Sequence, residues 1–305
     1  MSWSGRICLL GFGEVGTALA EDLLKATEAQ LQVWDVLLVD AESHPARALR
    51  AVAPTGRVRA APSAQTAALG CILTLSAVTA GQALAAAESV ARSLAPGSWF
   101  VDFNSVSPET KDAGRRVVAA AGGRYVEAAV MSPFLLRRSA TPMLLSGPNA
   151  AGFLEWAPAL GFSGMSLCSE QPGVAAAAKM CRSLIVKGTE ALLAEALLAA
   201  RHYGVETACL DSLGDLFPGV DWREQSRYMI LRSLQHGTRR AEEMREAART
   251  VQEAGVDATM SRATAERQAW AGRQADALDA PHLNALLDAI RQAASPLDTE
   301  DGNAG

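Results

Sequence analysis

The sequence has few cysteines and lacks the spacings that disulfide frameworks and zinc sites use. Its five cysteines form no C-x-x-C or C-x-x-H pattern, so we expect neither disulfides nor a bound metal. Cysteines of this kind are typical of buried thiols in a reducing compartment. A cytoplasmic location is therefore predicted.

Long apolar runs and an excess of positive charge are also missing. The alanine-rich stretches carry charges at helical spacing, which predicts no membrane span. The chain enters an apolar strand within six residues, so a signal peptide is not expected. A net charge of −5 argues against nucleic-acid binding. The 305 residues, 49% apolar and 20% charged, are typical of a globular protein with room for two domains.

Lysine is scarce relative to arginine. Only four of the 28 basic residues are lysines, namely Lys25, Lys111, Lys179 and Lys187. A lysine inside an apolar helix is therefore more informative here than usual.

A glycine-rich loop follows the first apolar run, Ile7 to Leu10. Gly11, Gly13 and Gly16 have the G-x-G-x-x-G spacing, and a helix is predicted to begin near Val15. The first glycine allows the tight turn, the second lets a pyrophosphate approach the backbone, and the third lets the helix pack on the strand. The N–H groups at the helix start favour a phosphate. We expect the cofactor-binding loop to comprise Gly11, Phe12, Gly13, Glu14, Val15 and Gly16.

A second predicted strand, Leu31 to Asp35, ends in an acidic residue. Asp35 lies at about the spacing expected for a carboxylate that binds the adenosine ribose. Its charge would repel a 2′-phosphate and no arginine follows directly, so NAD is preferred, with NADP possible. Asp40 is the competing candidate if the strand continues through Val36 to Val39.

Strands and helices alternate from Ile7 to about Cys168, which predicts a mostly parallel, doubly wound Rossmann sheet with helices on both faces. Ligands bind such sheets beyond the carboxyl ends of the strands. The strand ends of interest are Ser76 to Val78, Asn104 to Ser105, and Met131 to Ser132. The expected strands are Ile7–Leu10, Leu31–Asp35, Arg57–Ala60, Cys71–Leu75, Trp99–Phe103, Tyr125–Val130, Met143–Ser146 and Met165–Cys168; helices are expected at Ala80–Leu94 and Pro108–Ala121.

After Pro172-Gly173 the pattern becomes helical. A helix from Val174 to about Tyr203 is apolar nearly all round, which is typical of a buried helix, and further helices are expected at Asp211–Phe217, Asp221–Ala254, Ala258–Gly272 and Pro281–Ala294. The charged run from Arg239 to Glu246 is interpreted as a solvated face. The fold class is thus an N-terminal Rossmann domain, 1–170, followed by a long inter-domain helix and an all-helical C-terminal domain, 171–295, with a flexible tail, 296–305.

Lys179 is the strongest catalytic candidate. It lies early in the apolar helix, and Arg182 and Ser183 follow at i+3 and i+4, so the three side chains share a face. Lys187 and Glu190 continue this polar stripe. Polar groups in an apolar helix need partners or a purpose. Lys179 is therefore a candidate general acid/base, and a structural ion pair is the alternative.

Three motifs resemble the β-hydroxyacid dehydrogenase family, which includes 6-phosphogluconate and 3-hydroxyisobutyrate dehydrogenases. Gly11 to Gly16 is similar to the family's G-x-G-x-M-G loop, with Val15 in place of Met. The segment Asp102-Phe103-Asn104-Ser105-Val106-Ser107-Pro108 resembles D-x-S-T-x-x-P, which lies by the nicotinamide. Lys179 with Ser183 resembles K-x-x-x-N, in which the lysine is the catalytic acid/base.

The chain departs from the family in its substrate loop. The family's D-x-P-V-S-G-G stands here as Glu127-Ala128-Ala129-Val130-Met131-Ser132-Pro133, with both glycines lost, and Ser183 replaces the asparagine. The resemblance implies that Met131, Ser132, Arg182 and Ser183 contact an anionic small molecule. Arg137, Arg138 and His236 are weaker candidates for such contacts.

The implied function is an NAD(P)-dependent dehydrogenase acting on a small hydroxy acid, with the nicotinamide near Ser76, Val78, Asn104 and Ser105. Lys179 would take the hydroxyl proton as the hydride leaves carbon, and a homodimer or higher oligomer is expected. Two alternatives stay open: an imine reductase-like enzyme, and a dinucleotide-binding regulatory protein without catalysis.

Overall fold

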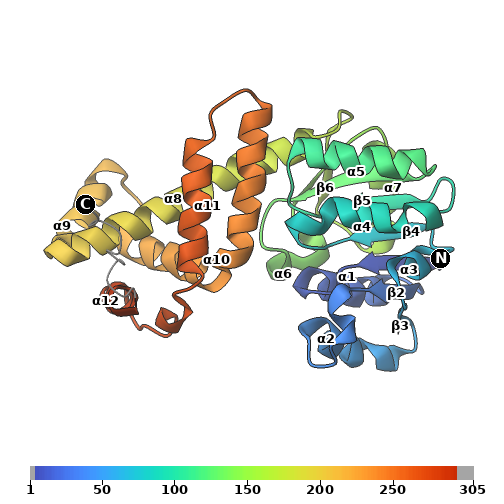
Figure 1. The fold of residues 1–305 in the computed structure, drawn as a ribbon, viewed down its shortest axis with the longest axis horizontal. Helices are drawn as coiled ribbons and strands as arrows, with labels where there is room; N and C mark the ends of the chain where they lie inside the picture. Colours follow the sequence, from blue (N-terminus) through green and yellow to red (C-terminus); the bar gives the residue numbers. More distant parts are fainter. Residues whose placement is uncertain (1–3, 294–305) are drawn as a thin grey trace, which may run out of the picture. The chain divides into compact units, whose positions relative to one another are not determined.

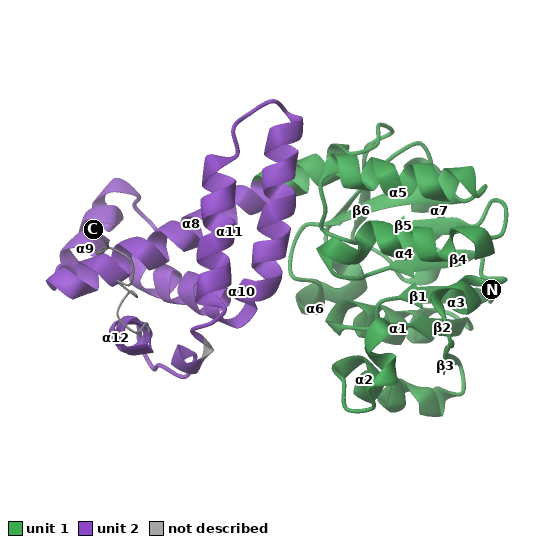
Figure 2. Cartoon of the chain, in the orientation of Figure 1, with its two compact units in different colours: residues 1–181 green, residues 182–305 purple. Residues whose placement is uncertain are grey.

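A computed structural model describes residues 4–293 of the chain, which divides into two compact units, residues 1–181 and 182–305 (Figure 2). The division lies within the helix α8 (Val174–Tyr203). The predicted flexible tail, 296–305, lies outside the described residues. Each unit is described separately below.

The first unit is an eight-stranded, mostly parallel sheet covered by helices (Figure 1). Its strand order is β3-β2-β1-β4-β5-β6-β7-β8, and only β7 runs antiparallel to its neighbour β6. The strand order reverses between β1 and β4, as in a doubly wound fold, and the predicted fold class is confirmed. The strands are β1 (Arg6–Leu10), β2 (Gln30–Trp34), β3 (Val58–Ala60), β4 (Leu73–Ser76), β5 (Trp99–Asp102), β6 (Arg124–Val130), β7 (Met143–Ser146) and β8 (Met165–Ser169).

Both faces of this sheet are apolar and both are covered. Side chains alternate between the faces of a strand: Ile7 and Leu9 of β1 belong to one buried cluster, and Cys8 and Leu10 belong to another. The first cluster includes residues of α1, α2, α6 and α7, and the second includes residues of α3, α4 and α5. These helices are α1 (Glu14–Ala26), α2 (His44–Val52), α3 (Ala64–Ala68), α4 (Ala83–Val90), α5 (Pro108–Ala120), α6 (Phe134–Arg137) and α7 (Ala150–Trp156).

Two sequence predictions change in the first unit. The segment Val36–Val39 is the 3-10 helix η1, so β2 ends at Trp34 and Asp40 does not follow a strand. The predicted helix Ala80–Leu94 is broken into η3 (Ala80–Gln82), α4 and η4 (Ala91–Ser93). Asp35 therefore remains as the acidic residue at the end of β2.

The second unit is entirely helical. It contains residues 182–203 of α8, then α9 (Glu206–Leu216), α10 (Trp222–Glu253), α11 (Thr259–Ala271) and α12 (Leu283–Ala293). Helix α9 begins at Glu206, ahead of the predicted Asp211. The backbones of helices α10 and α11 lie in close contact at Gly237. A Cβ atom at this position would lie 2.3 Å from the carbonyl oxygen of Gln268, so the contact requires glycine. The buried apolar core includes Leu197, Leu210, Ile230, Leu234, Leu286, Leu287 and Ile290.

Helix α8 corrects one expectation, because it is not buried all round. Ile185 and Leu192 are 71% and 62% exposed, whereas Ser183, Lys187 and Glu190 are buried. In the described chain the helix therefore has an apolar face on the surface and a polar stripe in the interior. Apolar content alone did not reveal which face packs inward.

The five cysteines are free, but only Cys8 and Cys71 are buried. Burial raises the pKa of the Cys71 thiol to about 11. Cys168, Cys181 and Cys209 are exposed, which corrects the expectation of uniformly buried thiols. Within residues 4–293, no helix is long and apolar enough to cross a membrane, and no cluster of His, Cys, Asp or Glu side chains could hold a metal ion.

Candidate functional site

The glycine loop between β1 and α1 has a separate structural reason for each glycine. Gly11 has a φ of +85°, and a Cβ atom there would lie 2.4 Å from the carbonyl oxygen of Ala77. A Cβ atom on Gly16 would lie 2.1 Å from the carbonyl oxygen of Gly11. A Cβ atom on Gly13 would meet nothing within 4 Å. Gly11 and Gly16 are thus required by the protein's own packing, whereas Gly13 leaves open space at the helix start.

That open space suits a pyrophosphate group. Helix α1 begins at Glu14, and its N-cap residue Gly13 makes no side-chain capping hydrogen bond. The first N–H groups of a helix attract anions. The ring of Phe12 is fully buried and Val15 is partly buried, while Glu14 is exposed. The loop therefore fits the phosphates of a dinucleotide through its backbone rather than its side chains.

Asp35 lies beside this loop. One carboxylate oxygen accepts a hydrogen bond from the Phe12 N–H at 2.7 Å, and the other accepts one from the Leu37 N–H at 2.8 Å. The side chain is only partly buried. Each carboxylate oxygen has a second lone pair, so Asp35 can still accept hydrogen bonds from ribose hydroxyls. Its orientation is fixed by the backbone.

A polar network joins the ends of β4 and β5. The Asn104 side chain accepts a hydrogen bond from the Val78 N–H at 2.7 Å and donates one to the Ser76 hydroxyl at 2.9 Å. The Asn104 N–H donates to the Asp102 carboxylate at 2.8 Å. Ser76, Val78 and Asn104, which were predicted to lie near the nicotinamide, are therefore brought together at one edge of the sheet.

Asp102 is the buried centre of this network. Its carboxylate lies 3.0 Å from the Lys111 ammonium and accepts a hydrogen bond from the Tyr125 hydroxyl at 2.6 Å. Lys111 is only 1% exposed. Burial, then the charge of Asp102, holds the pKa of Tyr125 well above its usual range. No sequence motif marks Lys111 or Tyr125 as part of this network, although the scarcity of lysine is a usable signal for Lys111.

Lys179 lies at the same edge. Its ammonium donates a hydrogen bond to the Ser105 hydroxyl at 2.5 Å, and the lysine is partly buried. Ser105 immediately follows Asn104. The structure therefore brings the candidate acid/base onto the segment that was predicted to lie by the nicotinamide.

The start of α8, which carries Lys179, is anchored by the sheet. The buried Glu127 carboxylate of β6 accepts hydrogen bonds from the N–H groups of Gly173, at 2.8 Å, and Ala176. The Ser146 hydroxyl of β7 accepts one from the Ala175 N–H at 3.2 Å. Sequence reasoning missed Glu127 as an anchor, because its partners are backbone groups far along the chain.

The predicted substrate loop follows β6. Met131 and Ser132 are partly buried, and the Ser132 hydroxyl oxygen is a buried atom with no hydrogen-bond partner among the described residues. Arg138 does not serve as a substrate clamp here, since it binds Asp22 at 2.8 Å and Glu21 at 2.8 Å on α1. Arg137 is exposed. The Ser132 hydroxyl is therefore a polar atom of this loop to which a ligand could bind.

The remaining candidates belong to the second unit. Arg182 is exposed, whereas Ser183 is buried. The Ser183 hydroxyl accepts a hydrogen bond from the Lys187 ammonium at 2.5 Å, and Lys187 also binds Glu243 of α10 at 2.5 Å.

The charged run of α10 is only partly solvated, which corrects its interpretation. Arg240 is 3% exposed and donates a hydrogen bond to Glu190 of α8 at 2.9 Å. Arg239 is exposed and binds Glu243 within α10. One side of the run thus completes the polar stripe of α8. His236 is partly buried on the same helix.

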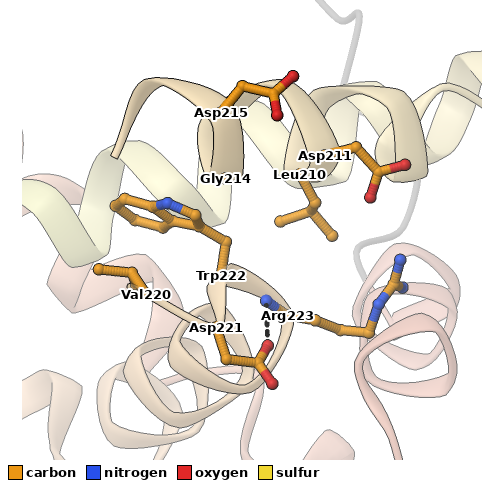
Figure 3. Close-up of a pocket in the computed structure, with 8 residues that line it drawn as sticks. All are labelled: Leu210, Asp211, Gly214, Asp215, Val220, Asp221, Trp222 and Arg223. Atoms are coloured by element: carbon orange, nitrogen blue, oxygen red, sulfur yellow. Dashed lines mark hydrogen bonds between the residues drawn. The ribbon is translucent and has the colours of Figure 1, made fainter. Parts of the chain in front are cut away.

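A cavity of about 410 Å³ opens in the second unit between α9 and the start of α10. Leu210 points from α9 toward the first turn of α10, whereas the Asp215 carboxylate points away from it (Figure 3). Asp221 caps α10 by accepting hydrogen bonds from the N–H groups of Arg223 and Glu224, each at 3.0 Å. None of the predicted site residues lines this cavity.

Comparison with known proteins agrees with this geometry. Residues 6–165 match the family described as the NAD binding domain of 6-phosphogluconate dehydrogenase, and residues 200–271 match a domain of unknown function, DUF1932. No curated protein matches the sequence.

Several solved structures are similar over nearly the whole chain. A conserved hypothetical protein from Sinorhizobium meliloti 1021 is 34% identical, with 95% of this chain and 97% of that one covered and a TM-score of 0.71. MTH1747, a conserved protein of unknown function described as structurally similar to 3-hydroxyacid dehydrogenases, is 29% identical over 87% of this chain and 97% of its own, with a TM-score of 0.65. The 3-hydroxyisobutyrate dehydrogenase of Mycobacterium tuberculosis is 17% identical over 96% and 100%, with a TM-score of 0.68, and shows the shared fold.

Proposed function

We propose that this chain, which belongs to the family described as the NAD binding domain of 6-phosphogluconate dehydrogenase, is an NAD-dependent dehydrogenase of small hydroxy acids. In this proposal Lys179 is the general acid/base. The observation that carries this proposal is the hydrogen bond from the Lys179 ammonium to Ser105. This bond joins Lys179, the acid/base candidate of α8, to the residue that follows Asn104. The side chain of Asn104 in turn binds Ser76.

The dinucleotide would be held by groups that the chain already orients. The backbone of the loop from Gly11 to Gly16 would bind the pyrophosphate. Asp35 would bind the ribose, and Ser76, Val78, Asn104 and Ser105 would surround the nicotinamide. When bound, the cofactor supplies a hydride acceptor or donor. The protein's task is to place the substrate carbon and to move one proton.

Lys179 would move that proton. In the oxidative direction its neutral amine accepts the proton of the substrate hydroxyl, and in the reductive direction its ammonium protonates the carbonyl oxygen. Ser105 accepts a hydrogen bond from the lysine and so restrains the position of Nζ. Hydride transfer and proton transfer need a fixed geometry, because a misplaced acid/base loses much of its effect on the rate.

The substrate is proposed to be anionic. Ser132 offers a buried hydroxyl without a partner among the described residues, and Met131 precedes it. Ser183 and the exposed guanidinium of Arg182 follow Lys179 on α8. A guanidinium suits a carboxylate because its planar donors match two oxygens.

NAD is proposed as the preferred cofactor over NADP. Asp35 is oriented by two backbone N–H groups, and its negative charge would lie close to a 2′-phosphate. Fluorescence titration with NADH and NADPH tests this directly. Tighter binding of NADPH would contradict it.

The activity can be tested with a panel of hydroxy acids and their carbonyl counterparts, followed by nicotinamide absorbance. Replacing Lys179 with Met should lower kcat by at least about 100-fold, the usual size of general acid/base catalysis, and leave the Kd for NADH unchanged. Lys25→Met is the matched control, because Lys25 is an exposed lysine at the end of α1. An equal loss in both variants would exclude the proposed role.

The same panel separates the alternative functions. Turnover of imines alone would favour an imine reductase. NADH binding without turnover of any hydroxy acid, carbonyl compound or imine would favour a regulatory protein.

A homodimer or higher oligomer is also proposed. The support is the exposed apolar face of α8, where Ile185 and Leu192 lie two turns apart on the same side of the helix, since contiguous exposed apolar side chains often mark an interface. Light scattering of the purified protein gives its mass. A monomer at micromolar concentration would contradict this part of the proposal.

A further inference from the structure

The segment between β6 and β7, residues 131–142 (the β6–β7 loop), lies against helix α1 (Figure 1). It contains Ser132, then α6, and then the 3-10 turn η5 (Arg138–Ala140). Its two ends are joined by a hydrogen bond of 2.9 Å from the Met131 N–H to the Pro142 carbonyl group. The loop and α1 both belong to the first unit, so the contacts between them lie within one compact body.

Arg138 has a backbone conformation that residues with side chains disfavour. Its φ is +52° and its ψ is −128°, and it is the only residue other than glycine with a positive φ among residues 4–293. Glycine adopts such angles readily, whereas a Cβ atom makes them costly. The surrounding structure must therefore hold Arg138 in this conformation.

The guanidinium of Arg138 makes the contacts that hold it. Its Nε donates a hydrogen bond to the Asp22 carboxylate at 2.8 Å, and one terminal nitrogen donates to the Glu21 carboxylate at 2.8 Å and the Ala18 carbonyl at 2.9 Å. The other carboxylate oxygen of Asp22, whose side chain is 13% exposed, accepts a hydrogen bond from the Ser139 N–H at 3.1 Å. The side chain and the backbone of the turn are thus both bound to α1.

The helix that holds Arg138 also begins at the glycine loop. Its first residue is Glu14, and Asp22 lies roughly 12 Å further along at 1.5 Å per residue. A glycine at position 138 would relieve the backbone strain but could not reach α1. One rigid helix would therefore carry the dinucleotide at its start and the β6–β7 loop farther along.

We propose that Arg138 is a positioning residue, which holds the β6–β7 loop and its Ser132 hydroxyl at a fixed place relative to α1 and therefore to the dinucleotide. This inference rests on the proposed function, because it assigns the loop to the substrate side of that site. Arg138 contacts neither reactant in this role and acts through the backbone of the turn. Its loss should therefore slow the reaction of the hydroxy acid without weakening NADH binding.

The chain offers a matched control in Arg57. Its guanidinium donates hydrogen bonds to the carbonyl groups of Leu24 at 2.5 Å and Thr27 at 2.6 Å, near the end of α1, and lies 3.6 Å from the Glu28 carboxylate. Its side chain is 24% exposed, against 34% for Arg138. None of these partners belongs to the β6–β7 loop. Arg57→Met should therefore loosen the packing of α1 without releasing the loop.

Two substitutions separate backbone strain from attachment to α1. Arg138→Met removes the contacts with α1 and keeps a Cβ atom at the strained position, whereas Arg138→Gly removes both the contacts and the strain. The thermal midpoint of Arg138→Gly should therefore lie about 2–4 °C above that of Arg138→Met. Stability that recovers in Arg138→Gly while catalysis does not is the signature of a positioning role.

The first measurement is steady-state kinetics with the hydroxy acid of the panel that the wild-type protein oxidises fastest. Arg138→Met and Arg138→Gly should each lower kcat/KM at least about tenfold, because a displacement of about 1 Å can cost about 100-fold in rate. The Kd for NADH should stay within about twofold of wild type in both, and Arg57→Met should keep kcat/KM within about threefold. Arg138→Met combined with Asp22→Asn should fall no further than Arg138→Met alone, because both changes remove the same contact.

The second measurement needs no turnover. Hydrogen exchange of the β6–β7 loop is followed by mass spectrometry in the NADH complex. The N–H groups of Ser139 and Thr141 donate hydrogen bonds within and beside the turn, so their exchange reports opening of the loop. Exchange of the loop should be at least about tenfold faster in both Arg138 variants and within about twofold of wild type in Arg57→Met.

The outcomes are distinct. Recovery of kcat/KM in Arg138→Gly, an equal loss in Arg57→Met, unchanged loop exchange, or faster loop exchange with a normal kcat/KM would overturn the positioning role. If Arg138→Met does not fold, Arg138→Gly carries no strain and provides the same comparison with Arg57→Met. Faster loop exchange in a protein that turns over no member of the panel would contradict the proposed dehydrogenase activity, and the positioning role with it, while the attachment of the loop to α1 would stand.

Discussion

Two polar side chains at the strand ends of the first unit and two between α8 and α10 of the second unit are held by different kinds of partner. Asn104 and Asp35 bind backbone N–H groups of neighbouring segments. Lys187 and Arg240 bind side chains of another helix. A backbone partner is fixed by the register of the sheet, whereas a side-chain partner depends on helix packing. Backbone partners therefore suit the rigid strand ends where a cofactor would bind. A single side-chain substitution can remove a partner of Lys187 or Arg240.

Substitutions in the glycine loop should have the largest effects on folding and NADH binding, and Gly16→Ala and Gly13→Ala should differ from each other. Gly16→Ala places a Cβ atom 2.1 Å from a backbone oxygen, so we expect little folded protein, because close-packed backbone cannot shift cheaply. Gly13→Ala meets open space and should keep its thermal midpoint within about 2 °C of wild type, yet bind NADH at least about tenfold more weakly. Differential scanning fluorimetry and NADH titration measure both. Equal behaviour of the two variants would refute the separate roles of these glycines.

Asp102→Asn tests whether the buried ion pair supports the strand ends. It leaves the Lys111 ammonium buried without its counter-charge, which typically costs about 3–5 kcal/mol of unfolding free energy, and NADH affinity should fall through the Asn104 segment. Urea denaturation gives the stability. The control is Asp112→Asn on α5, whose ion pairs with Arg115 and Arg116 are partly exposed and should be worth less than about 1 kcal/mol. A similar loss in both variants would show that burial of Asp102 is unimportant.

Tyr125→Phe should have the smallest effect, and its size should depend on pH. The folded-state pKa of Tyr125 is raised by burial and then by Asp102, so the folded protein keeps a proton that the unfolded chain releases above about pH 10. Wild-type stability should therefore decline as pH rises above that value, and Tyr125→Phe should decline less. Below pH 9 the variant should lose about 1.5–3 kcal/mol of unfolding free energy, the usual value of one hydrogen bond to a charged group. Urea denaturation between pH 8 and 11 compares them, and parallel curves would contradict the assignment.

The sequence predicted those features whose causes are local. The glycine spacing predicted the loop because each glycine acts within a few residues, and apolar runs predicted all eight strands and helix α8. The sequence motif that begins at Glu127 does not predict its anchoring role, because Glu127 binds the backbone of Gly173 and Ala176, which no side-chain pattern marks. The predicted exposure of Arg240 is wrong, because ion pairs within one helix and ion pairs between two helices produce the same pattern of charges in the sequence. The exposure of Ile185 depends on which neighbours pack beside α8, and one helix alone does not contain that information.

Glu127 has a consequence for where an anion can bind. A carboxylate from β6 already occupies the electropositive end of α8, and the Ser107 hydroxyl caps α5 in the same way. At the start of α1 the N-cap residue is Gly13, which makes no side-chain capping hydrogen bond. An anionic group is therefore disfavoured at the N-terminus of α8, the helix that carries Lys179. It is favoured at the N-terminus of α1, which follows the glycine loop. Glu127 thus closes the N-terminus of α8 to a diphosphate, whereas the N-terminus of α1 stays open to one.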